Sequence, residues 1–227
     1  MRIKIKRIKS KIKKLKMSRR PNIIEKITRK IEVIKDRMNG LDFLTVIPTA
    51  QLGLDPKLVS QCSPSGNGYL TSLLKEFLVT ESDDILDIGC GKGSAILRMT
   101  ECKFNNIDGI EIVKQHAEVA KTNFKKLGIQ NVQIFNEDAT QFNGYNKYNY
   151  FYMYNPFPRI VMQLVISRIL EQTSVGRKIT IIYNNPVCHE VLISAGLNII
   201  KVYPDQWGNG INVYSNIKNE WNSFNVK

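Results

Sequence analysis

Apolar side chains recur every three or four residues along the first 40 residues, which is the spacing of one helical face. The first run of these positions consists of Ile5, Ile8, Ile12 and Leu15. Pro21 interrupts the pattern, and Asn22 followed by Glu25 resembles a capping box that starts a second helix. The second run consists of Ile24, Ile27, Ile31, Ile34 and Met38. Because Gly40 then ends the pattern, we predict an amphipathic helical extension over residues 1–40.

From residue 67 onward, short apolar runs alternate with helical patterns. We predict strands over residues 84–88, 106–110, 132–135, 148–154, 178–183, 199–203 and 211–214. We predict helices over residues 69–78, 92–100, 113–127, 160–171 and 187–195. This alternation indicates an α/β domain over residues 41–227, with a doubly wound, mostly parallel seven-stranded sheet that ends in an antiparallel hairpin. Such sheets bind ligands at the carboxyl ends of their strands, where the strand order switches.

The sharpest chemical pattern is the run Asp-Ile-Gly-Cys-Gly-Lys-Gly-Ser at residues 87–94, between a predicted strand and a predicted helix. Its glycines permit a tight turn and a close approach of the backbone to a ligand. A P-loop is excluded, because Leu86 stands where that loop needs glycine and Gly93 stands where it needs serine or threonine. The dinucleotide fingerprint is incomplete, because Ser94 takes its third glycine position. Asp87 would repel a pyrophosphate, but it suits a ligand that carries a positive charge.

This loop resembles motif I of the class I, Rossmann-like methyltransferases, which use S-adenosylmethionine (SAM), and the similarity extends over about residues 67–215. Glu111 ends the second strand, as the ribose-binding acid does in that family. Asp138 follows the third strand, in the segment whose acid contacts the adenine amino group. The resemblance implies that SAM is the cofactor. It implies cofactor contacts from Asp87, Gly89, Cys90, Gly91, Gly93, Glu111, Ile112, Asp138, Ala139 and Asn155, with Tyr69 and Thr71 from the preceding helix.

Residues 155–158, Asn-Pro-Phe-Pro, follow the fourth strand and resemble the [DNS]-PP-[YFW] motif of amino-group methyltransferases, with the second proline displaced by Phe157. The overall run of motifs is also similar to small bacterial methyltransferases related to the non-SET histone-lysine methyltransferases, in which an Asn-Phe segment closes the cofactor pocket. The resemblance therefore gives Asn155 and Phe157 a catalytic position, either at the acceptor or over SAM. The structural alternative is that Asn155 and Pro156 only cap the next helix.

Three further places carry side chains that suit a site. Residues 184–186, Asn-Asn-Pro, end the fifth strand and could line the same cleft or simply form a turn. His189 is a candidate base, although a lone histidine is more often structural. Trp207 stands at the predicted hairpin tip and could line a substrate mouth or pack. These residues do not change the predicted cofactor.

The basic charge is confined to one end of the chain. Of the 33 basic and 20 acidic residues, 16 and 3 lie in residues 1–40, which leaves 17 of each in residues 41–227. A groove that follows a phosphate backbone is expected to be basic, so the neutral body disfavours a large nucleic-acid acceptor. Residues 1–20 could contact an anionic membrane surface or remain a solvated tail, and RNA binding or an organellar transit peptide are further alternatives.

The four cysteines bear on the cellular compartment of the protein and not on a binding site. Cys62, Cys90, Cys102 and Cys188 form no CxxC pair and no cysteine–histidine pattern spaced for zinc. We interpret them as reduced thiols of a cytoplasmic protein, and they imply no metal.

The patterns together predict a SAM-dependent methyltransferase. The expected reaction is in-line displacement of the methyl group from the sulfonium, which depends largely on positioning. We favour a glycan, a lipid-linked intermediate or a protein side chain as the acceptor. An RNA or DNA amino-group methyltransferase is the alternative, and a SAM-binding protein without turnover is a further one.

Overall fold

The computed structural model describes residues 23–47, 63–66, 68–203 and 210–217. Its helices are α2 (Ile23–Met38), α3 (Gly68–Lys75), α4 (Ser94–Met99), α5 (Lys114–Leu127), the 3₁₀ turn η2 (Tyr145–Lys147), α6 (Arg159–Gln172) and α7 (His189–Ser194). Its strands are β1 (Asp84–Ile88), β2 (Asn106–Ile110), β3 (Ile134–Phe135), β4 (Tyr150–Tyr154), β5 (Thr180–Asn184), β6 (Asn198–Tyr203) and β7 (Ile211–Ser215). The first predicted apolar run, over residues 1–20, lies outside the described residues.

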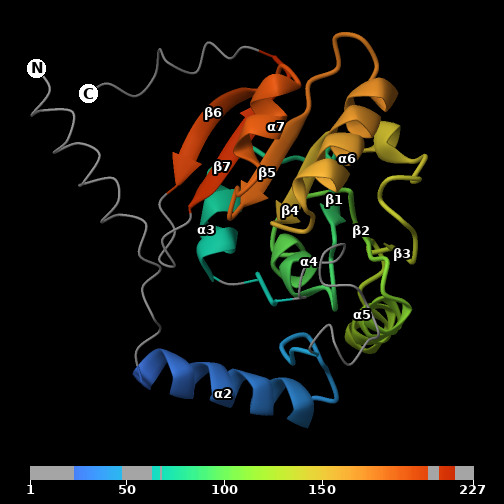
Figure 1. The fold of residues 1–227 in the computed structure, drawn as a ribbon. Helices are drawn as coiled ribbons and strands as arrows, with labels where there is room; N and C mark the ends of the chain where they lie inside the picture. The colour runs from blue at the N-terminus through green and yellow to red at the C-terminus, as the bar shows by residue number, and fades with distance from the viewer. Residues whose placement is uncertain (1–22, 48–62, 67, 204–209, 218–227) are drawn as a thin grey trace, which may run out of the picture.

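The strands form one seven-stranded sheet in the order β3-β2-β1-β4-β5-β7-β6. The pairs among β1 to β5 are parallel, whereas β7 pairs antiparallel with both β5 and β6. The predicted doubly wound sheet with a C-terminal antiparallel hairpin is therefore confirmed. The chain runs outward from β1 through β2 and β3 and then returns to β4 (Figure 1). The carboxyl ends of β1 and β4 consequently flank the switch point, where ligands bind in this architecture.

Helices cover both faces of the sheet, so its central strands are apolar on both sides. Leu86 and Ile88 of β1 face a core that α6 and α7 complete, while Ile85 faces a core completed by α3, α4 and α5. The two layers hold β1 rigidly from both faces, and with it the loop that follows.

Several observed elements are shorter than predicted: the helix predicted over residues 69–78 ends at Lys75, and the strands predicted from residues 132, 148 and 178 each begin two residues later. The helix predicted from Lys92 begins at Ser94, because Gly93 has a left-handed φ of 86° and cannot continue a right-handed helix. The strand predicted from Tyr148 begins at Tyr150, because the preceding residues form η2. The Tyr148 hydroxyl donates to Asp108 of β2 at 2.7 Å.

Helix α2 lies apart from the two layers, below the sheet as drawn in Figure 1. Residues 41–47 lead from its end toward α5 and the loop after β1. None of the helices that the structure describes is long and apolar enough to cross a bilayer.

Candidate functional site

The glycine loop after β1 is a tight turn held by the neighbouring strand. Gly89, Gly91 and Gly93 all have left-handed φ values, of 80°, 55° and 86°. The amides of Gly89 and Cys90 donate to the carbonyl of Ile110 at 2.9 and 3.0 Å, which ties the loop to the end of β2. A Cβ at Gly89 would lie only 2.9 Å from Cβ of Pro156. A glycine at this position therefore lets the loops after β1 and β4 meet.

Two carboxylates converge beneath this loop. Asp87 is buried near the end of β1, and Glu111 is buried immediately after β2. Burial raises the pKa of Asp87 well above its usual range, and the charge of Glu111 raises it further. Burial also raises the pKa of Glu111, although its carboxylate accepts hydrogen bonds from the amides of Gly91 and Val113, both at 2.8 Å. A buried pair of acids is costly without compensation, so the site favours a ligand with positive charge.

The ends of β2 and β3 lie side by side and present the residues predicted to hold adenine. The Asn136 side chain donates to the carbonyls of Glu111 and Ile112, at 2.8 and 3.1 Å. Ile112 is 50% exposed and offers an apolar surface next to these polar groups. Asp138 is exposed, and one of its oxygens accepts from the amide and the hydroxyl of Thr140. Ala139 is buried, and its carbonyl accepts from the hydroxyl of Tyr145 at 2.7 Å.

Asn155 follows β4 at the switch point and adopts a left-handed conformation, with φ of 39°. Non-glycine residues in this region concentrate at functional sites, and asparagine tolerates it better than most. Its amide donates to the carbonyl of Asn184 at 3.1 Å, which holds the loops after β4 and β5 together. Phe157 is half-buried and packs against the core beneath α6 and α7. Asn155 thus lies beside the glycine loop, whereas the ring of Phe157 is partly used in packing.

Two buried polar atoms near the same part of the fold lack protein partners. The Thr71 hydroxyl of α3 and the side-chain carbonyl oxygen of Asn184 are buried, and neither bonds any residue that the structure describes. Asn184 uses its amide nitrogen to donate to the hydroxyl of Tyr152 at 3.1 Å. Buried polar atoms normally find a partner, so these two are suited to a ligand. Tyr69 lies in the first turn of α3, and its side chain is outside the described part.

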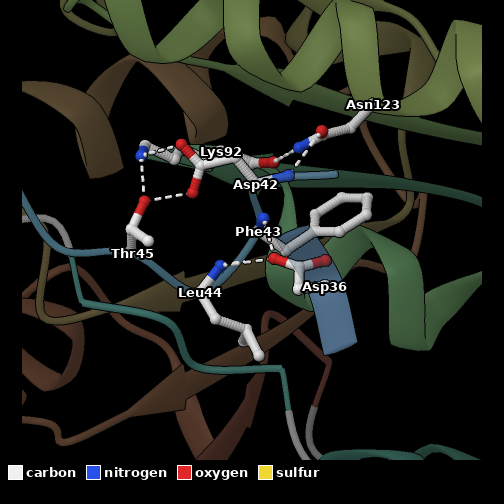
Figure 2. A network of polar contacts seen from close by, with 7 residues as sticks. All are labelled: Asp36, Asp42, Phe43, Leu44, Thr45, Lys92 and Asn123. Carbon is white, nitrogen blue, oxygen red and sulfur yellow. Dashed lines mark hydrogen bonds and ion pairs between the residues drawn. The ribbon is translucent and has the colours of Figure 1, made fainter. Parts of the chain in front are cut away.

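A polar network ties the glycine loop to the segment after α2, and Figure 2 shows its members. The Lys92 ammonium is buried within the loop and donates to the carboxylate of Asp42 at 2.6 Å and to the hydroxyl of Thr45 at 2.7 Å. The amide of Asp42 donates to the Asn123 side chain of α5 at 3.0 Å, and that side chain donates to the carbonyl of Lys92 at 3.3 Å.

The same segment is fixed to α2 at its other side. The Asp36 carboxylate accepts from the amides of Phe43 and Leu44, at 2.6 and 3.2 Å (Figure 2). Lys92, Asp42 and Asn123 were not among the predicted site residues. The one signal that could have pointed to them was a lysine between the glycines, which requires a partner once it is buried.

The remaining candidates are a histidine used in packing, the turn after β5 and a residue outside the described part of the chain. The His189 ring shares a hydrogen bond with the hydroxyl of Tyr214 on β7, at 2.8 Å, which accounts for it as a structural residue. Asn185 has a left-handed φ of 51°, and its amide donates to the carbonyl of Gly210. Trp207 is outside the described part of the chain.

The site is therefore an α/β switch point with a glycine turn, paired buried acids and an exposed apolar residue beside them. A family model described as a methyltransferase domain matches residues 85–172. No curated protein matches the chain at a significant level.

Solved structures with the same fold include a SAM-dependent methyltransferase from Aquifex aeolicus. It is 16% identical, over 74% of this chain and 97% of that one, with a TM-score of 0.53. A ribosomal protein L11 methylase from Lactobacillus delbrueckii subsp. bulgaricus is 14% identical, over 69% of this chain and 83% of that one, with a TM-score of 0.53. At these identities the two structures establish the fold.

The family match spans β1 to α6, which is the part of the chain that forms the switch point. Residues 85–172 match a methyltransferase domain and the chain has the fold of SAM-dependent methyltransferases, which supports SAM as its cofactor. The predicted enzyme class and cofactor are thereby confirmed. The roles of the individual site residues stay predictions, although Asp87, Glu111, Asn155 and the glycine loop lie where those roles require.

Proposed function

We propose that this protein transfers the methyl group of SAM to a nucleophile on a glycan, a lipid-linked intermediate or a protein side chain. The observation that carries this choice is the balance of 17 basic and 17 acidic residues over residues 41–227. An enzyme that grips a polynucleotide along its catalytic body needs an excess of cations there.

The chain's own residues divide the work of holding the cofactor. Bound SAM supplies a methyl group already activated on a sulfonium. Asp87 and Glu111 place negative charge beside the glycine turn, where Asp87 would face the cationic methionine portion of SAM and Glu111 would accept from its ribose hydroxyls. Ile112 would pack against the adenine ring, and Asp138 would accept from the adenine amino group.

Asn155 is the residue best placed to orient the acceptor. Its left-handed backbone directly precedes Pro156, which lies against Gly89 of the glycine loop. Its side-chain carbonyl accepts from the Tyr183 hydroxyl at 3.5 Å and can accept a further hydrogen bond from an incoming hydroxyl or amine. Holding the nucleophile in line with the sulfur–methyl bond supplies much of the acceleration, because the leaving group needs no further activation. The Asn155 side chain therefore acts by positioning and not as a base.

The rival function is methylation of an amino group on RNA or DNA, which the sequence Asn155-Pro156-Phe157 favours. Base recognition in that class needs an aromatic ring free to stack on the extruded base. The packing of Phe157 against the core beneath α6 and α7 supports the first function over this one.

The deciding experiment incubates the full-length protein with methyl-labelled SAM and separated lipid, glycan, protein and RNA pools from the same cells. We expect label in the lipid, glycan or protein pool that survives nuclease treatment. Label confined to RNA and removed by ribonuclease would establish the rival function instead. A Phe157→Leu variant sharpens the test, because a packing role tolerates leucine and a stacking role does not.

A further inference from the structure

Helix α2 exposes its apolar face. Five side chains spaced by three or four residues are 46% to 81% exposed: Ile23, Ile27, Ile31, Ile34 and Met38. At about 100° per residue they fall within a sector of about 80° on the helix surface. We call this sector the α2 stripe. A helix of a globular protein normally turns such a stripe toward the core.

The side of α2 that faces the body is nearly opposite the stripe. Val33 and Asp36 are the half-buried residues of its second half. Asp36 is anchored by its hydrogen bonds to the amides of Phe43 and Leu44. These hydrogen bonds fix the rotation of the helix about its own axis, and in that rotation the five side chains of the α2 stripe are exposed.

Charge is sorted around the stripe. The exposed side chains of Lys30 and Arg37 border one edge, and that of Lys35 borders the other. The acids Glu32 and Asp36 lie on the far side together with Arg29, and Asp36 is about 180° from the middle of the stripe at the spacing of an α-helix. The occupant of the stripe must therefore be apolar at its centre and anionic at both margins.

We propose that α2 lies in the headgroup region of an anionic lipid bilayer, with the α2 stripe buried among the acyl chains and Lys30, Lys35 and Arg37 on lipid phosphates. An amphipathic helix with basic margins binds in this manner, and long cationic side chains reach from the apolar boundary to the headgroups. The proposal does not depend on which acceptor is methylated.

Three other occupants fit the same surface less well. A second α2 would bring the basic margins of both stripes together, which is repulsive in either orientation. Residues 1–20 carry 11 basic residues and no acid, so they meet the same repulsion. The phosphates of RNA would pair with the cationic margins, but RNA would leave the isoleucines in water. Single-stranded bases stack on aromatic side chains, and α2 has none.

The test is co-sedimentation of the full-length protein with vesicles of phosphatidylcholine alone or with phosphatidylglycerol added. Ile31→Gln/Ile34→Gln removes apolar surface from the stripe without adding charge. Leu164→Gln on α6 is the matched control, because Leu164 is also an exposed apolar residue of a helix, at 54%. A triple variant removes the positive charges that border the stripe: Lys30→Gln/Lys35→Gln/Arg37→Gln. Its control removes three positive charges from α5: Lys114→Gln/Lys121→Gln/Lys125→Gln.

We expect binding to the anionic vesicles that falls at least about tenfold in each α2 variant and is unchanged in each control. SAM binding by the α2 variants should match wild type, because the stripe contributes nothing to the core. The proposal is wrong if the α2 variants bind vesicles like wild type, or if neutral vesicles bind equally well. Concentration-dependent dimerisation that the Gln pair abolishes, without vesicle binding, would also overturn it and assign the stripe to a second copy.

Discussion

The switch point of the sheet and helix α2 distribute charge and apolar surface in opposite ways. At the switch point, Asp87 and Glu111 are buried and the surrounding apolar side chains form the core. On α2, isoleucines are exposed and the charged side chains surround them. Each arrangement is unfavourable for the isolated chain, and each is relieved by a different class of ligand. A cationic small molecule compensates the first, and an apolar, anionic surface compensates the second.

The contrast assigns two tasks to two regions of one chain: the switch point carries out the chemistry, and α2 determines where the protein is located. The segment between the two regions is held at both ends, by Asp36 on α2 and by Lys92 in the glycine loop (Figure 2). The same short connection therefore fixes α2 relative to the cofactor loop. Variants can now be chosen that alter one region and leave the other intact.

The largest effect is expected from Asp87→Asn. The substitution keeps the shape of the side chain and removes the charge, so SAM affinity should fall by at least about 100-fold. The apo protein should become more stable, because a buried carboxylate that is repelled by Glu111 is gone. Calorimetric titration with SAM and thermal unfolding of the apo protein measure the two effects. A variant that binds SAM like wild type would remove Asp87 from the site.

The next effect concerns residues 1–20 rather than α2. If this segment also contacts an anionic surface, its deletion should weaken binding to phosphatidylglycerol vesicles by at least about tenfold, since each cation near such a surface contributes. The part of the vesicle binding that the deletion removes should be the part most sensitive to salt concentration. SAM affinity is the control and should not change. Vesicle binding that survives the deletion unaltered would restrict the membrane contact to α2.

A pH titration follows from the raised pKa of Asp87. The folded apo protein binds this proton more tightly than the unfolded chain, whose carboxyl has a pKa of about 3.9. The apo protein therefore gains stability as pH falls through the folded-state pKa toward that value. SAM affinity should fall over the same range, by up to about tenfold per pH unit, because a protonated Asp87 no longer attracts a cation. Asp87→Asn should lose most of the affinity response and the Asp87 part of the stability response, while the part from Glu111, whose pKa burial also raises, remains. A wild-type affinity independent of pH would contradict this account.

The smallest effect is expected from the connection between the two regions. Lys92→Met leaves Asp42 without its cation and should lower the free energy of unfolding by about 1–2 kcal/mol, with a few-fold loss of SAM affinity through a looser loop. Lys201→Met, which breaks a more exposed pair with Glu76, should cost no more than about 0.5 kcal/mol and leave SAM affinity unchanged. Chemical denaturation and SAM titration of both variants provide the comparison. If the two variants lost the same stability and the same SAM affinity, Lys92 would have no role in positioning the loop.

The cofactor edge could be predicted because its signals are local. Asp87 and the three glycines are adjacent in sequence, and β1 and β2 have the predicted bounds. The partners that cross the fold could not be predicted in the same way. Tyr152 meets Asn184 only because β4 pairs with β5, and Lys92 meets Asp42 from 50 residues away.

Helix α2 shows a different limit of prediction from sequence. The apolar period of residues 24–38 predicted a helix, and α2 occupies that range. Periodicity defines an apolar face but not what lies against it. That direction is set by Asp36, which binds the amides of Phe43 and Leu44, and by the hydrogen bond that ties the same segment to Lys92.

The central claim is that the switch point performs methyl transfer while α2 brings it to a surface. The most direct test is transfer from methyl-labelled SAM into an isolated, nuclease-treated membrane fraction by wild type, Asp87→Asn and Ile31→Gln/Ile34→Gln. We predict that Asp87→Asn transfers no label, and that the α2 variant transfers less than wild type at equal SAM binding. Label transferred by Asp87→Asn at the wild-type rate would contradict the account.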